Sequence, residues 1–282
     1  MSSNMKYPLF SKNVHIANYR DYRPTYSAQL YDHIIQYYFN TSNPSQEKVP
    51  LALDIGCGSG QATVDLSRYC DKVIGIDGSQ NQLANPMQKD NIDYQCRNAE
   101  DLTFLSPNSV DLITVATALH WFNIEKFFIQ VDRVLRPNGG VLCIWFYNNF
   151  NTFDNEEAQN VEQEFYLHLL DNTGWSDELK KLHYNYDLIM HLFPYERTRV
   201  KHVVNCEKEM SIKQYMKLVE TWSACQLFKE RNGEKECNHL LQQFANKLVY
   251  CYKSSNNKDD NDLYETKMLI CWPVTLYLMK KI

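Results

Sequence analysis

Long apolar runs are missing from this 282-residue chain. No stretch reaches the ~18 uninterrupted apolar residues of a membrane-spanning helix, so the sequence predicts no membrane association. The first eight residues, MSSNMKYP, do not lead into the long apolar centre of a secretory signal. We therefore expect a soluble protein that works in the cytoplasm.

The nine cysteines lack the spacing of a metal site. Neither a C-x-x-C pair nor a His-Cys cluster occurs, so we predict no bound metal. Cys143 and Cys271 lie in apolar, strand-like runs, where a free thiol behaves as a small apolar side chain. Reduced cysteines are the expectation.

Dense positive charge is also missing from the first half of the chain, and the net charge is −5. A protein that binds DNA or RNA usually presents a basic patch, so we predict no nucleic-acid partner. A small-molecule substrate is favoured. We expect a monomer or a weak dimer.

A glycine-rich turn, LALDIGCGSG at residues 51–60, is the most informative feature that is present. An apolar strand runs into a loop with Gly56, Gly58 and Gly60 at every second position, and residues 61–66 resume as a helix. Glycine admits backbone angles and close approaches that a Cβ forbids. A ligand is therefore expected against this loop, although a tightly packed turn without a ligand is the alternative.

The spacing of these glycines distinguishes between ligands. A dinucleotide-binding G-x-G-x-x-G turn would need its third glycine at position 61, where Gln61 stands. The frame here is G-x-G-x-G, preceded by Asp54. A nicotinamide dehydrogenase is thus the less favoured alternative.

Strand and helix patterns alternate through the first half of the chain, which predicts a doubly wound, Rossmann-like α/β core with a parallel sheet. A capped helix at 27–38 precedes the first strand. Further strands are predicted at 72–77, 92–97, 110–116 and 141–147, and an amphipathic helix at 127–135.

After residue 151 the alternation ends. Helices are predicted at 154–171, 211–222 and 240–252, two strands at 200–205 and 269–278, and a mobile loop at 254–262. This pattern fits a seven-stranded sheet that ends in an antiparallel pair, with a helical insertion as a lid. We divide the chain into an N-terminal lid and first helix (1–48), a ligand-binding core (49–150), and a helical substrate cap with the last two strands (151–282).

Asp77 is predicted to end the second strand, 17 residues beyond Gly60. Ligands of open parallel sheets lie outside the carboxyl ends of the strands, and an acid there can accept both hydroxyl hydrogens of a ribose. The alternative is that Asp77 caps the turn that begins near Ser79. We favour the ribose.

The fourth predicted strand ends in Ala116, followed by LHWF at 119–122. Aromatic faces stabilise a cation and shield a reacting group from water. His120 and Trp121 are therefore the candidate catalytic residues. The alternatives are core packing for Trp121 and a structural hydrogen bond for His120, because a lone histidine rarely identifies a base.

Over residues 49–147 the glycine loop, Asp77, the RNAED loop at 97–101, His120-Trp121 and LRPNGG at 135–140 together resemble the class I S-adenosylmethionine-dependent methyltransferases. YRDYRPTY at 19–26 and LHWF look like the branch of trans-aconitate and fungal cantharidin-resistance methyltransferases. The resemblance implies S-adenosyl-L-methionine as cofactor, S-adenosyl-L-homocysteine as product, and a cofactor site of Asp54, Gly56, Cys57, Gly58, Gly60, Asp77, Gly78, Asn98, Ala99, Glu100 and Ala116.

That branch methylates small molecules, often on a carboxylate oxygen. A carboxylate with a pKa near ~4 is ionised at neutral pH and needs no general base. Arg20 and Arg23 would bind it through paired hydrogen bonds, with Tyr19 and Tyr22 sealing the pocket and Trp121 and Trp145 lining it. The alternatives are an arginine paired with Asp21 on an exposed loop, a phenol, amine or thiol acceptor, and a protein that binds the cofactor without turnover.

Overall fold

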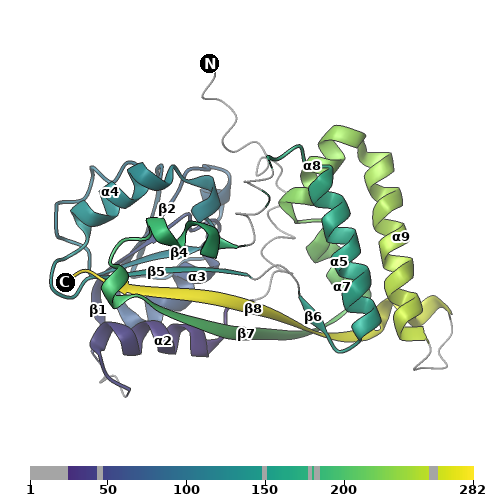
Figure 1. The fold of residues 1–282 in the computed structure, drawn as a ribbon, viewed down its shortest axis with the longest axis horizontal. Helices are drawn as coiled ribbons and strands as arrows, with labels where there is room; N and C mark the ends of the chain where they lie inside the picture. The colour runs from purple at the N-terminus through teal and green to yellow at the C-terminus, as the bar shows by residue number, and fades with distance from the viewer. Residues whose placement is uncertain (1–24, 43–46, 148–150, 177–179, 181–184, 254–259) are drawn as a thin grey trace.

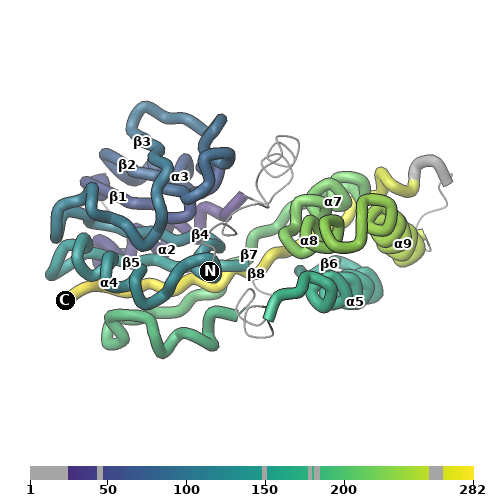
Figure 2. Tube along the Cα trace, turned by 90° about the horizontal axis from the view of Figure 1, so that it is seen from above, coloured from purple at the N-terminus to yellow at the C-terminus, as the bar shows by residue number. Residues whose placement is uncertain are grey.

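The computed structural model describes residues 25–42, 47–147, 151–176, 180, 185–253 and 260–282. It has two parts, shown in Figure 1: an α/β lobe that contains most of the sheet, and a helical lobe made of α5, α7, α8 and α9. Two long strands, β7 (Val200–Ser211) and β8 (Lys267–Lys280), extend from one lobe to the other (Figures 1 and 2).

The sheet runs in the order β3-β2-β1-β4-β5-β8, with β7 on the outer side of β8. Its first five strands are parallel: β1 (Val49–Ile55), β2 (Cys70–Asp77), β3 (Ile92–Cys96), β4 (Leu112–Ala116) and β5 (Val141–Tyr147). β8 is antiparallel to both β5 and β7. The predicted doubly wound sheet and its antiparallel pair are therefore confirmed. One element was not expected, the two-residue strand β6 (Thr152–Phe153), which pairs with β8.

Helices cover both faces of the sheet because successive strand residues point to opposite sides. Ala52 packs with α2 (Ala28–Phe39) and α3 (Gln61–Leu66), whereas its neighbour Leu53 packs in the cluster that contains α4 (Ile124–Val134). The central strand β5 is apolar along its whole length for this reason.

The helical lobe contains α5 (Glu156–Asp171), α7 (Ile212–Val219), α8 (Ser223–Asn232) and α9 (Glu234–Lys253). The predicted helices at 154–171, 211–222 and 240–252 are confirmed in α5, α7 and α9, and Ser211 caps α7 through a capping box with Gln214. The prediction missed α8, whose apolar residues follow no clear helical stripe. The end of the predicted mobile loop is also wrong, because residues 260–265 form a short 3₁₀ helix.

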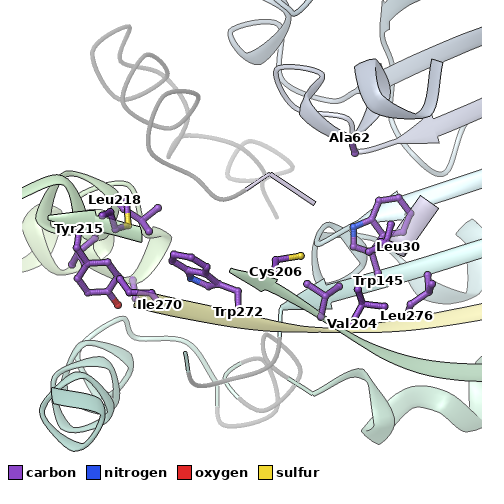
Figure 3. Close-up of a cluster of buried hydrophobic side chains, with 14 of the residues drawn as sticks. Leu30, Ala62, Trp145, Val204, Cys206, Tyr215, Leu218, Ile270, Trp272 and Leu276 are labelled. Atoms are coloured by element: carbon purple, nitrogen blue, oxygen red, sulfur yellow. The ribbon is translucent and has the colours of Figure 1, made fainter. Parts of the chain in front are cut away.

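One apolar cluster joins the two lobes along β8 (Figure 3). From the α/β lobe to the helical lobe it passes through Trp145, Leu276, Val204, Cys206, Trp272, Ile270 and Tyr215. A shared core of this kind resists independent movement of the two lobes. Within the described part of the chain, no helix combines the length and apolar character needed to cross a membrane.

Candidate functional site

The glycine loop leaves β1 with three left-handed residues at alternate positions, at φ 71° for Gly56, 55° for Gly58 and 88° for Gly60. A Cβ on Gly60 would lie 2.1 Å from the Tyr94 hydroxyl oxygen, and one on Gly56 would lie 2.5 Å from Ala118 Cβ. The side chains of Tyr94 and Ala118 therefore leave room only for glycine at positions 60 and 56. Gly58 differs, because a Cβ there would meet no atom of the described residues within 4 Å. Its open side belongs to a cavity.

This cavity lies outside the carboxyl ends of the parallel strands and contains about 610 Å³ of space that no protein atom fills, its open mouth included. The described residues that line it are Gly56, Gly58, Asp77, Gly78, Gln82, Arg97, Ala99, Ala116, Thr117, Ala118, Trp121 and Phe122. Seven of the residues predicted for the site are in this set: Gly56, Gly58, Asp77, Gly78, Ala99, Ala116 and Trp121.

Asp77 connects two backbone segments at the wall of the cavity. Its Oδ2 accepts a hydrogen bond from the Gly58 N–H at 2.9 Å, and its Oδ1 accepts one from the Ser79 N–H at 2.8 Å. The contact with Ser79 is the capping role considered as an alternative, yet each carboxylate oxygen keeps a second lone pair for a ligand. Burial raises the pKa of Asp77, and the two N–H donors oppose that rise.

Asp54 lies beneath the glycine loop and does not line the cavity. It is fully buried, and it accepts hydrogen bonds from Thr63 Oγ1 at 2.6 Å and from Thr114 Oγ1 at 2.8 Å. Burial raises the pKa of Asp54 to about 6 although both hydroxyls oppose the rise. The side chain holds α3 and β4 under the loop, so it supports the site from below.

The loop after β3 contributes Arg97 and Ala99 to the cavity wall, but not Asn98 or Glu100. Glu100 Oε1 accepts a hydrogen bond from the backbone N–H of Asn123 at 2.6 Å, immediately before α4. Its carboxylate thus fixes the start of that helix. Cys57 and Gly60 are absent from the lining as well; the Cys57 thiol is buried and lies near Gly75.

The segment after β4 forms the opposite wall with Thr117, Ala118, Trp121 and Phe122. Thr117 has a left-handed φ of 52°, which is unusual for a β-branched residue and costs on the order of 1–3 kcal/mol. Such strained residues cluster at functional sites. The Thr117 Oγ1 lies 3.3 Å from the hydroxyl of Tyr26.

His120 is buried beside this wall without lining the cavity. Its Nδ1 lies 2.8 Å from the hydroxyl of Tyr186, which belongs to the 3₁₀ helix Tyr186–Leu192. Burial raises the pKa of Tyr186 strongly, so this hydroxyl stays protonated at neutral pH. Trp121 does line the cavity and meets Trp175 edge-on, with ring centroids 6.2 Å apart.

Trp145, predicted to contact substrate, is fully buried in the apolar cluster on the α2 and α3 side of the sheet and does not line the cavity. Tyr26 packs edge-on against it at 5.4 Å. The four other residues predicted to bind substrate, Tyr19, Arg20, Tyr22 and Arg23, lie outside the described residues.

Five lining residues were not predicted: Gln82, Arg97, Thr117, Ala118 and Phe122. Gln82 is buried, and its Oε1 has no hydrogen-bond partner among the described residues. Arg97 and Thr117 directly follow strands whose ends were located, so their positions carried a usable signal. Gln82 carried none, because it lies on a short 3₁₀ turn without a recognisable pattern. No group of three or more potential metal ligands occurs among the described side chains.

Comparisons with known proteins agree with this geometry. The family described as "Methyltransferase domain" matches residues 53–143. A Dictyostelium discoideum protein, provisionally named a methyltransferase, is 35% identical over 264 residues, which are 94% of this chain and 92% of that protein. The Saccharomyces cerevisiae protein CRG1, provisionally named an S-adenosylmethionine-dependent methyltransferase, is 35% identical over 60% of this chain and 55% of its own length.

Among solved structures, a provisionally assigned type II methyltransferase from Anaeromyxobacter dehalogenans superimposes with a TM-score of 0.71. It is 25% identical, and the match covers 92% of this chain and 98% of that one. A second structure, provisionally assigned as a methyltransferase of an antibiotic biosynthesis pathway in Anabaena variabilis, is 15% identical with a TM-score of 0.54 and supports the fold alone.

Proposed function

Because the chain belongs to the S-adenosylmethionine-dependent methyltransferases, we propose that it transfers a methyl group to a carboxylate oxygen of a small molecule. It is an enzyme, and S-adenosyl-L-methionine is its cofactor. Beyond this assignment we propose the acceptor, the roles of individual residues, and a place in the trans-aconitate and cantharidin-resistance branch.

The described residues of the cavity fit this cofactor. The open side of Gly58 lets a ligand approach the loop backbone, which would hold the methionine part. Asp77 has acceptor capacity for the ribose hydroxyls. Ala99 is small enough for the adenine to lie against it, and the unpaired Oε1 of Gln82 suits an amino group on that ring.

Bound S-adenosyl-L-methionine supplies a methyl group attached to a positively charged sulfur, which an in-line nucleophile can displace. The protein contributes alignment and a dry environment. Trp121 and Phe122 provide aromatic faces at the wall that follows β4, and such faces favour a nearby cation. They also keep out water, which would compete with the acceptor.

The observation that favours a carboxylate is that the cavity wall after β4 carries no general base. Its described lining residues are Thr117, Ala118, Trp121 and Phe122, whereas His120 is buried beside the wall, with its Nδ1 against the Tyr186 hydroxyl. A phenol or amine would need a base to remove its proton, whereas a carboxylate is already ionised. The site is therefore suited to a nucleophile that arrives without a proton.

We propose Arg20 and Arg23 as the groups that bind this carboxylate. Support comes from Tyr26, whose hydroxyl lies 3.3 Å from Thr117 Oγ1 at the cavity wall. Arg23 is only three residues earlier in the chain, and three residues span at most roughly 10 Å. We propose that a guanidinium tethered this close to the cavity wall binds the carboxylate through two parallel hydrogen bonds.

A panel of carboxylates, phenols, amines and thiols incubated with radiolabelled S-adenosyl-L-methionine tests the acceptor. We expect label in carboxylates and a loss of at least ~10-fold in kcat/KM for them in Arg20→Ala and Arg23→Ala, since each removes a charged hydrogen-bond partner. Calorimetry with S-adenosyl-L-homocysteine is the control and should give unchanged affinity in both variants. Label found only in phenols, amines or thiols would contradict the carboxylate.

The remaining proposals concern the whole chain. We propose that residues 1–48 and 151–282 flank a cofactor-binding core at 49–150, and that the protein acts as a monomer or weak dimer in the cytoplasm without a nucleic-acid partner. The net charge of −5 supports the absence of a nucleic-acid partner. Size-exclusion chromatography with light scattering tests the oligomeric state, and a fluorescent fusion tests the location.

A further inference from the structure

Two buried thiols meet in the helical lobe, far along the chain from the cofactor site. Cys225 lies in the first turn of α8, and Cys237 lies in the first turn of α9. Their Sγ atoms are 3.8 Å apart, and each residue is 2% exposed. Gly233, with a left-handed φ of 92°, ends α8 and turns the chain so that α9 packs back on it (Figure 1).

From this juxtaposition we propose that Cys225 and Cys237 form a reversible disulfide that fastens α8 to α9 when a peroxide oxidises the protein. The sulfurs are in van der Waals contact, and a disulfide brings them to about 2.05 Å. The cross-link closes a short loop within one lobe, so it does not require the lobes to move.

Helix position and charge both favour a thiolate at this pair. Each thiol lies in the first turn of its helix, where a thiolate is favoured. The hydrogen bond with the Cys225 thiol and the nearby Lys229 lower the pKa of Cys237, although burial raises it. By contrast, burial raises the pKa of Cys57 and Cys143. In this proposal Cys237 is the nucleophile and Cys225 the resolving thiol.

The chemistry balances with hydrogen peroxide as the oxidant. The Cys237 thiolate attacks one peroxide oxygen, so an S–O bond forms, the O–O bond breaks, and hydroxide leaves. The Cys225 sulfur then attacks Cys237, so the S–S bond forms, the S–O bond breaks, and the Cys225 proton leaves with the departing hydroxide as water. Two thiols lose two electrons and the peroxide is reduced to two waters. A dithiol reverses the reaction by exchange.

Mass spectrometry of the full chain provides the test. Trypsin separates the two cysteines into peptides 218–229 and 236–247, each with a single cysteine. After mild peroxide treatment and alkylation we expect these two peptides to be linked, and dithiothreitol to release them. The oxidised protein should melt about 5 °C higher than the reduced protein, because the cross-link restricts the unfolded chain.

Three variants and one internal control complete the design. Cys225→Ser and Cys237→Ser should abolish the link and the rise in Tm, whereas Cys251→Ser, at another buried cysteine of α9, should retain both. Exposed Cys96 reports that peroxide has reacted. Oxidised Cys96 beside unlinked peptides 218–229 and 236–247 in the wild-type protein would overturn the proposal, even if a serine variant failed to fold. So would a link to any other cysteine.

Discussion

The carboxylate of Asp77 holds the backbone N–H of Gly58 at 2.9 Å, which joins the end of β2 to the glycine loop that leaves β1. The two residues are 19 positions apart, and both line the cavity. Because Asp77 also accepts from Ser79, one side chain shapes two backbone turns of the cofactor site. Asp77 therefore stabilises the shape of the site even before a ligand binds.

Replacement of Asp77 by Asn should weaken S-adenosyl-L-homocysteine binding by at least ~10-fold. The amide keeps one acceptor oxygen but turns an N–H₂ group toward a backbone N–H, so one of the two turns loses its hydrogen bond. Isothermal titration calorimetry measures the effect. Asp93→Asn, an exposed acid on the neighbouring strand β3, is the matched control and should bind normally. Equal affinity in wild type and Asp77→Asn would exclude this role.

Two glycines of the loop should respond differently to alanine. Gly60→Ala places a Cβ 2.1 Å from the Tyr94 hydroxyl, so we expect a loss of about 2–4 kcal/mol in the free energy of unfolding. Gly58→Ala meets no described atom within 4 Å and should cost only about 1 kcal/mol, yet its Cβ enters the cavity and should reduce cofactor affinity. Denaturant unfolding and calorimetry separate the two effects. The same phenotype in both variants would contradict the geometry.

Stability should fall as pH rises from about 5 to 8. Glu162 is buried in the helical lobe, where burial raises its pKa to about 8, against hydrogen bonds from Tyr215 and Asn151 that lower it. The folded state therefore binds this proton more tightly than the unfolded state, and the advantage disappears as pH rises through the folded pKa. Asp54, with a pKa of about 6, acts in the same direction below neutrality.

Glu162→Gln should remove most of this dependence and be the more stable protein at pH 9, by up to about 4 kcal/mol. Glutamine keeps the oxygen that accepts from Asn151 and Tyr215. Glu164→Gln, on the exposed side of the same helix, should follow the wild-type pH curve. Parallel melting curves for wild type and Glu162→Gln from pH 5 to 9 would disprove the assignment.

His120→Gln should retain methyl transfer to a carboxylate within about 10-fold, because an ionised acceptor needs no base. If His120 instead acted as the base for a phenol acceptor, the same change would cost at least ~100-fold, the usual contribution of a general base. Tyr186→Phe, which removes the partner of the His120 Nδ1, is the companion variant. A loss of more than 100-fold with carboxylates would make His120 a catalytic base and remove the argument for a base-free reaction.

Local patterns sufficed for much of the fold. The strand at 51–55, the glycine turn and the acid at position 77 were located because each depends on neighbours within a few residues. Elements that depend on distant partners were missed. α8 has a weak apolar stripe and is ordered by contacts with α5 and α9, and β6 pairs with a strand more than 100 residues away.

The sequence alone indicated the cofactor through its resemblance to the methyltransferases, which rests on the glycine loop, the acid at position 77 and the later motifs in their order. Tertiary structure decided which side chains face the cavity. The Asp54 carboxylate accepts hydrogen bonds from Thr63 and Thr114 instead of lining the cavity. The Glu100 carboxylate accepts one from the backbone at the start of α4. The His120 ring contacts the hydroxyl of Tyr186, 66 positions away. The packing of α8 against α9 likewise brought Cys225 and Cys237 together. A residue type limits what a side chain can bind, but only the packing of distant segments determines which partner it meets.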